Sequence, residues 1–246
     1  MKRILLALGS ASLLLTSCHT AATSSPTLRA GAFYSNPTQV DFVEAAARGN
    51  IPQIDEFLKT GLDINARGKE GMTPLLLTLL RQNKSGFKYL LENGANPNLL
   101  VDTGESVIMY ATRAEDAEWL QLALKHGGNP NLTGARNKEP PLHDSIIFRR
   151  KENMRLLITA GADLNLQDGV GDTPLITAAS LNAYDIVYEL LEIGADYRIH
   201  NLSNVTIADR IARSPMDPKN ELARWRGKVI EWLAQRGIKA VPPRAP

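Results

Sequence analysis

The sequence of 246 residues predicts an all-α repeat solenoid, and three observations support this. Five glycine-led segments recur with their first glycines 33, 33, 34 and 33 residues apart: GLDIN, GANPN, GGNPN, GADLN and GADYR, which begin at residues 61, 94, 127, 161 and 194. A second series keeps the same phase: MTPLLLTLL from Met72, SVIMYAT from Ser106, PPLHDSI from Pro140 and DTPLITAA from Asp172. An amphipathic run such as FKYLLENG or MRLLITAG precedes the glycine of each repeat. Two motifs that stay in phase over several periods indicate stacked helical repeats.

The two series together resemble the ankyrin-repeat family, with its TPLH…A…LL..GADVN pattern, over about residues 39–198. The resemblance implies helix–turn–helix repeats joined by β-hairpin loops. It also implies a concave protein-binding face, formed by the hairpin tips and the first helix of each repeat.

The order of residues within a repeat has a physical explanation. Thr73 and Thr173 can cap the first helix of their repeats, with Pro74 and Pro174 at the first helical position, where no hydrogen-bond donor is lost. The glycine of each repeat ends the second helix because it tolerates positive φ. The Asn at the end of each segment is interpreted as a turn residue rather than a ligand, at Asn65, Asn98, Asn131 and Asn165.

Elements are expected in the following order. An N-terminal cap spans residues 39–65, with helices in 40–50 and 51–61, and full repeats span 66–98, 99–131, 132–165 and 166–198. A divergent C-terminal cap follows at 199–240, with an inserted loop at 214–220. Trp225 and Trp232 lie seven residues apart on one face of its last helix. They form either a hydrophobic lid on the last repeat or a partner site.

Before the repeats, residues 1–17 are predicted to be a signal peptide, with Lys2 and Arg3 preceding an apolar stretch at 4–15 that is too short to span a bilayer. Leu15-Thr16-Ser17-Cys18 resembles the lipobox of bacterial lipoproteins. The resemblance implies that Cys18, the only cysteine, is the lipidated first residue of the mature chain. His19 in place of Asp favours the outer membrane over the inner one. Residues 18–38, rich in Ala, Ser, Thr and Pro, are expected to form a flexible tether, interrupted by Phe33 and Tyr34 docking on the first helix.

The composition argues against several classes of function. Without Lys2 and Arg3 the chain has 26 basic and 26 acidic residues, so charge gives no reason to expect nucleic-acid binding. No two histidines have zinc-ligand spacing, and Gly169 and Gly171 belong to a repeat loop rather than a phosphate-binding loop. His143 occupies the histidine position of the TPLH motif, for which the resemblance implies a structural role. We therefore expect no catalytic residue, no metal and no cofactor.

The family pattern places a set of positions on the exposed inner face, several of them apolar or aromatic beside arginines, as interface hot spots often are. The predicted protein-binding residues are Lys69, Glu70, Met72, Leu80 and Arg81 in the first repeat, Asp102, Thr103, Glu105, Tyr110 and Arg113 in the second, Arg136, Asn137, Glu139, Phe148 and Arg149 in the third, and Val170, Asp172, Ser180, Leu181 and Asn182 in the fourth. The third repeat, with Pro140-Pro141 and the basic FRRKE segment, is the first choice for a specific contact.

Two functions remain open at this point, because the lipobox resemblance counts against a third, an ankyrin effector that acts on a host. Periplasmic lipoproteins built from such repeats resemble immunity proteins that bind and occlude antibacterial phospholipase effectors of type VI secretion. The alternative is an envelope scaffold or an oxidative-stress protection protein. In both cases we expect a non-catalytic, lipid-anchored chain in the bacterial envelope, facing the periplasm and monomeric when unbound.

Overall fold

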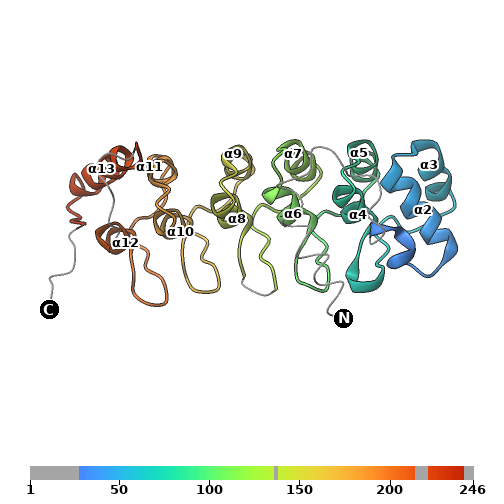
Figure 1. The fold of residues 1–246 in the computed structure, drawn as a ribbon, viewed down its shortest axis with the longest axis horizontal. Helices are drawn as coiled ribbons and strands as arrows, with labels where there is room; N and C mark the ends of the chain where they lie inside the picture. The colour runs from blue at the N-terminus through green and yellow to red at the C-terminus, as the bar shows by residue number, and fades with distance from the viewer. Residues whose placement is uncertain (1–27, 136–137, 214–220, 241–246) are drawn as a thin grey trace. The chain divides into compact units, whose positions relative to one another are not determined.

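The computed structural model describes residues 28–135, 138–213 and 221–240 (Figure 1). Within them it contains twelve α-helices and two short 3-10 helices. Their bounds are η2 Ala30–Ala32, α2 Pro37–Arg48, α3 Ile51–Lys59, η3 Lys69–Gly71, α4 Pro74–Leu80, α5 Lys84–Glu92, α6 Val107–Arg113, α7 Glu118–Lys125, α8 Pro141–Ile147, α9 Lys151–Thr159, α10 Pro174–Ser180, α11 Tyr184–Glu192, α12 Ile207–Arg213 and α13 Glu221–Ala234. No β-strand forms among the described residues, so the loops predicted as β-hairpins consist of turns. We call them hairpin loops below.

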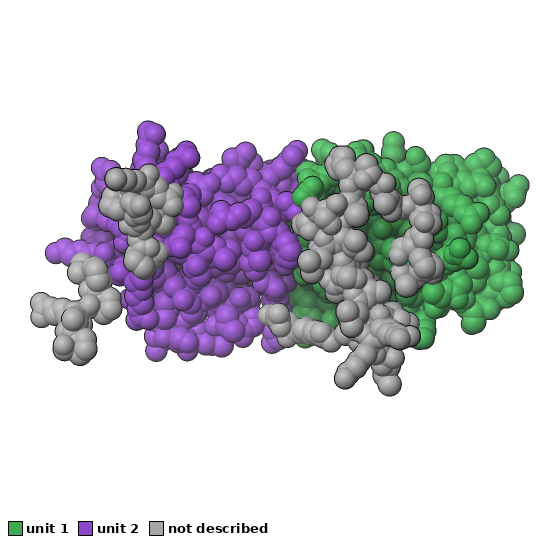
Figure 2. Space-filling view, viewed as in Figure 1, with its two compact units in different colours: residues 1–136 green, residues 137–246 purple. Residues whose placement is uncertain are grey.

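The helices form six pairs, as the repeat pattern predicts, and the all-α repeat solenoid is confirmed. The chain divides into two compact units, residues 1–136 and residues 137–246 (Figure 2). Unit 1 contains α2 to α7 and unit 2 contains α8 to α13. Within each unit, first helices contact first helices, as α4 contacts α2 and α6, and α10 contacts α8 and α12. Second helices likewise contact second helices, as α5 contacts α7 and α11 contacts α13.

The predicted helix starts are confirmed at the two Thr-Pro positions. The Thr73 Oγ1 accepts a hydrogen bond from the Leu76 N–H at 3.2 Å, and the Thr173 Oγ1 accepts one from Ile176 at 3.4 Å. A proline follows each cap at the first helical position. These caps satisfy backbone donors that the first turn of a helix cannot pair internally.

Burial along the first helices explains how little of them can reach a partner. In α4, α6, α8 and α10 the first six of the seven residues are buried, because neighbouring first helices cover one side and the second helix of the same repeat covers another. The core therefore includes whole turns such as Leu75–Leu79 rather than a single stripe. Only the last residue of such a helix and the residues after it are left for solvent.

The asparagines after the repeat glycines do turn the chain, and they also connect neighbouring repeats. The Asn65 Oδ1 accepts a hydrogen bond from the Asn96 N–H at 2.8 Å, and the Asn98 Oδ1 accepts one from Asn129 at 2.7 Å. The Asn165 Oδ1 does the same for Asp196 at 2.7 Å. Because each bond spans 31 residues, this side chain fixes the separation of successive hairpin loops.

Part of the segment predicted as a tether is folded, and this moves the boundary predicted at residue 39 towards the N-terminus. Tyr34 is buried, and its hydroxyl donates to the Met72 carbonyl oxygen at 2.7 Å. The Phe33 carbonyl oxygen accepts a hydrogen bond from the Lys69 N–H at 2.7 Å. One repeat later, the Glu70 carbonyl oxygen accepts one from the Asp102 N–H in the same way. Phe33 and Tyr34 thus dock on the first hairpin loop, where they take the place of a preceding one. The rest of the predicted tether, 18–27, and the signal peptide lie outside the described residues.

The C-terminal cap closes unit 2 as a sixth helix pair. Val229 and Leu233 of α13 are fully buried against α11 and α12. Trp225 packs on Tyr188 of α11, with ring centroids 5.7 Å apart. Trp232 and Tyr197 form a T-shaped pair, with ring centroids 5.5 Å apart. These contacts support the interpretation of both tryptophans as a lid. The insertion predicted at 214–220 lies outside the described residues.

Candidate protein-binding surface

The accessible part of each repeat consists of its hairpin loop and the residues that end its first helix. Lys69, Asp102 and Arg149 are exposed, as predicted, and Leu181 is 37% exposed. Glu70 and Glu139 are half-buried. Arg136 and Asn137 lie outside the described residues.

Two predicted contact residues are wrong, because they are not exposed. Met72 and Tyr110 are each 1% exposed. Met72 precedes α4, where its carbonyl oxygen also binds Tyr34, and Tyr110 lies in the covered part of α6. Neither side chain can contact a partner without a rearrangement of its repeat.

Tyr110, Glu105 and Arg113 instead form a polar cluster along α6, from Glu105 just before its start to Arg113 at its end. The Tyr110 hydroxyl donates to the Glu105 carboxylate at 3.0 Å, and the other oxygen of that carboxylate pairs with Arg113. Burial, followed by the charge of Glu105, raises the pKa of Tyr110 far above its ordinary value, so the phenol stays protonated. Glu105 and Arg113, both predicted as contacts, therefore also hold their own repeat together.

Arg81 has a comparable internal partner. Its guanidinium lies 2.8 Å from the Glu44 carboxylate of α2, which also accepts the Ala30 N–H at 2.8 Å. Burial alone would raise the pKa of Glu44, but the Ala30 N–H and Arg81 together lower it. Arg81 thus joins the N-terminal segment and α2 to the first full repeat.

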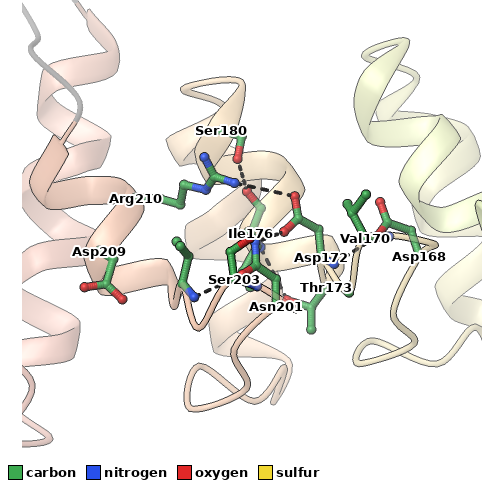
Figure 3. Close-up of polar contacts among 12 residues, drawn as sticks. Asp168, Val170, Asp172, Thr173, Ile176, Ser180, Asn201, Ser203, Asp209 and Arg210 are labelled. Carbon is green, nitrogen blue, oxygen red and sulfur yellow. Dashed lines mark hydrogen bonds and ion pairs between the residues drawn. The ribbon is translucent and has the colours of Figure 1, made fainter.

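In unit 2 a predicted contact residue, Asp172, is engaged in the same way (Figure 3). Its carboxylate accepts a hydrogen bond from the Asn201 side chain at 2.7 Å and lies 3.8 Å from the Arg210 guanidinium of α12. Its N–H donates to Asp168 at 2.9 Å. Asp172 therefore connects its own hairpin loop to the next repeat, and only part of its side chain faces solvent.

Among the described residues, all five large apolar side chains that are exposed lie in unit 2. They are Ile147 (39%), Val170 (60%), Leu181 (37%), Ile193 (46%) and Leu202 (79%). Only Val170 and Leu181 are among the predicted contacts. Leu202 is not among the predicted contacts because it belongs to the C-terminal cap, which follows the family pattern only loosely.

Four of these five side chains form two patches. The hairpin-tip patch consists of Val170 and Leu202, which are neighbours because the Leu202 N–H donates to the Val170 carbonyl oxygen at 3.2 Å. The helix-end patch consists of Ile147, Phe148, Arg149 and Leu181, where the Arg149 guanidinium donates to the Leu181 carbonyl oxygen at 3.2 Å. Exposed apolar residues beside an arginine are suited to protein contacts. Ile193, at the end of α11, belongs to neither patch.

His143 has the structural position that its motif implies. It is fully buried in α8, and its Nε2 lies 2.9 Å from the Asp172 carbonyl oxygen. Burial lowers the pKa of His143 below its ordinary value, so the ring is held neutral.

The described residues also lack two other kinds of feature. No group of three or more His, Cys, Asp or Glu side chains that could hold a metal ion occurs in the described part of the chain. In the same ranges, no helix combines the length and apolar character needed to cross a membrane.

Comparison with known proteins agrees with the geometry. A family model described as ankyrin repeats in three copies matches residues 42–133, 77–168 and 108–201. Protein PhlB of Serratia liquefaciens is 33% identical over 149 residues, which are 61% of this chain and 65% of PhlB. The phosphocholine transferase AnkX of Legionella pneumophila is 28% identical over 156 residues, but the match spans only 16% of that protein. Among solved structures, the ankyrin-repeat domain of Bcl-3 superposes with a TM-score of 0.67 at 22% identity, covering 81% of this chain and 86% of that domain.

Proposed function

The chain belongs to the ankyrin-repeat family, whose repeats form protein-interaction modules, and from that premise we propose that it is a membrane-tethered immunity protein. In this proposal the chain is anchored through lipid on Cys18 and faces the periplasm. There it binds an antibacterial phospholipase effector of type VI secretion and covers its active-site entrance. The inhibitor itself performs no catalysis.

The observation on which the proposal rests is the concentration of exposed apolar side chains in unit 2. Val170 and Leu202 protrude at adjacent hairpin tips, and Ile147 and Leu181 end adjacent first helices. Covering such side chains with a partner is favourable by about 25 cal/mol per Å² of apolar surface buried, so they are suited to a protein contact. A stable protein complex buries about 800 Å² on each partner, so the two patches would form the apolar part of a larger interface.

Occlusion suits a target that attacks membrane lipids. A lipase must admit a large substrate, so a protein seated over the entrance blocks it without any chemistry by the inhibitor. The lipobox resemblance at Leu15–Cys18 supports the location, since an anchored inhibitor would be concentrated on the surface where such an effector acts.

The direct test is an inhibition titration. The genes on either side of this one are first searched for a phospholipase, and its product is then titrated with purified residues 18–246 carrying Cys18→Ser, with vesicle hydrolysis as the readout. We expect hydrolysis to fall linearly to zero at one equivalent. Absence of inhibition at micromolar concentrations contradicts the immunity function, and a catalase gene in the neighbouring position would favour the stress-protection alternative.

Variants of the two patches locate the contact. We expect Val170→Asp with Leu202→Asp, or Phe148→Ala with Arg149→Glu, to weaken inhibition by about tenfold or more while the melting temperature changes little. Ile193→Asp is the matched control, because Ile193 is also exposed in unit 2 but lies outside both patches. Equal effects of the control and the patch variants would place the contact elsewhere.

A further inference from the structure

The outer flank of α13 presents two similar groups of aromatic and basic side chains. In the first, Trp225 packs on Tyr188, and the Lys228 ammonium lies 4.1 Å from the centroid of the Trp225 ring and 5.5 Å from that of Tyr188. In the second, Trp232 packs on Tyr197, and the Arg236 guanidinium lies 3.4 Å from the Trp232 ring centroid. Because the tryptophans are seven residues apart, both groups lie on one side of the helix. We call them the aromatic–cationic strip.

The strip exceeds what a lid on the last repeat needs. The buried contact of α13 is made by Val229 and Leu233, which are fully covered. Both tryptophans, Lys228 and the two tyrosines remain partly exposed, and Arg236 is exposed. The Trp232 Nε1 donates to Glu192 at 2.7 Å, so the indole is held with its polar edge satisfied and part of its ring at the surface.

Charge along the chain is uneven, and the strip lies in its basic part. Residues 198–246 contain ten Lys and Arg against four Asp and Glu, whereas residues 1–197 contain eighteen against twenty-two. Within the described ranges, no carboxylate lies within ion-pair distance of Arg224, Lys228 or Arg236. These cations are therefore available to an anionic surface.

We propose that the aromatic–cationic strip docks on the surface of an anionic phospholipid bilayer. Tryptophan and tyrosine favour the headgroup region, where an apolar ring meets a polar edge, and neighbouring Lys and Arg pair with lipid phosphates. The strip combines both features on one exposed helix flank. It is a second membrane contact, separate from the lipid anchor on Cys18 and from the partner patches of unit 2.

The test uses residues 18–246 with Cys18→Ser, so that neither the lipid anchor nor a lipase contributes to the result. Vesicles of phosphatidylglycerol and phosphatidylethanolamine are compared with vesicles of phosphatidylcholine. Trp119 is 6% exposed and packs on Phe87, so a blue shift of tryptophan emission reports Trp225 and Trp232. We expect a blue shift and co-flotation with the anionic vesicles, both lost as the salt concentration rises.

Charge variants make the test specific to the strip. We expect Lys228→Glu with Arg236→Glu to reduce partition onto anionic vesicles by at least about tenfold, since each cation near such a surface contributes about a fivefold change. Lys88→Glu with Lys125→Glu makes the same charge change on the exposed second helices of unit 1 and should leave partition within about threefold. Circular dichroism checks that all variants remain folded.

Three outcomes would overturn the proposal. They are no emission shift with anionic vesicles, equal binding to both kinds of vesicle, and equal loss in the strip and control variants. If the strip variant binds vesicles as well as the parent does but no longer inhibits the lipase, the strip is a protein contact instead.

Discussion

His143 is the buried group whose titration has the clearest consequence for stability. Its Nδ1 has no hydrogen-bond partner among the described residues, and its Nε2 contacts a carbonyl oxygen, so a second proton would be buried without an acceptor. Burial lowers the pKa of His143 in the folded state, whereas the pKa of a histidine in the unfolded chain is about 6.5. As the pH falls below about 6.5 the unfolded chain takes up a proton that the folded chain does not, and stability is lost.

The corresponding prediction concerns His143→Gln, which keeps a side-chain donor near the Asp172 carbonyl oxygen. We expect the urea concentration at the unfolding midpoint of the parent to decrease when the pH is lowered from 7.5 to 5.5. The midpoint of the variant should decrease clearly less over the same range. The carboxylates with lowered pKa, such as Glu44 and Asp185, affect stability only at lower pH, because the pKa of Glu and Asp in the unfolded chain is about 4. An unchanged pH dependence in the variant would mean that His143 is charged in the folded protein.

At the residue scale, sequence reasoning predicted backbone roles better than exposure. The Thr73 and Thr173 caps, the glycines with positive φ and the turn-forming asparagines depend on local geometry, which the repeat pattern shows directly. Exposure depends on what the next repeat covers. Met72 and Tyr110 are buried because long side chains at those positions turn towards the neighbouring elements, and the period of the sequence contains no information about that choice.

At the scale of helices, Gly86 and Gly227 can be compared directly. Both are glycines inside a helix, but their surroundings differ. A Cβ on Gly86 of α5 would lie 2.0 Å from the Ala46 carbonyl oxygen of α2, so the glycine permits close approach of the two helices. A Cβ on Gly227 of α13 would have no heavy atom within 4 Å, and the backbone there has an ordinary helical φ.

The two alanine variants are therefore expected to have opposite signs. Gly86→Ala should lower the free energy of unfolding by about 2 kcal/mol or more, because backbone has to move. Gly227→Ala should raise it by about 0.5 to 1 kcal/mol, because alanine restricts the unfolded chain and favours the helix. Urea unfolding of both variants against the parent measures the pair, and destabilisation by Gly227→Ala would contradict the described exposure of that site.

The N-terminal element shows why one part of the fold could not be predicted. The six helix pairs follow from periodicity, which the segment before residue 37 does not have. Its packing depends on two hydrogen bonds, one from the Tyr34 hydroxyl to the Met72 carbonyl oxygen and one from the Lys69 N–H to the Phe33 carbonyl oxygen. These bonds join residues that are 36 to 38 apart in the chain. Composition alone therefore predicted a tether where the structure has the first hairpin contact.

For the whole molecule, the proposed attachment to the membrane depends on a residue outside the described ranges. Cys18→Ser removes the thiol that the lipobox resemblance implicates, while the described contacts begin ten residues later. We expect the variant to move from the membrane fraction to the soluble fraction after washing at high salt, with an unchanged melting temperature of the repeats. Retention of the variant in the membrane fraction after that wash would contradict the lipid anchor.

The central claim is that this ankyrin-repeat chain acts by binding a protein through unit 2. Isothermal titration calorimetry of residues 18–246 with Cys18→Ser against a phospholipase effector found among the neighbouring genes measures this directly. We expect one-to-one binding with a Kd below about 1 μM, weakened by about tenfold or more in Val170→Asp with Leu202→Asp and unchanged in Ile193→Asp. No binding at micromolar concentrations, or the same affinity in the patch variant, would contradict it.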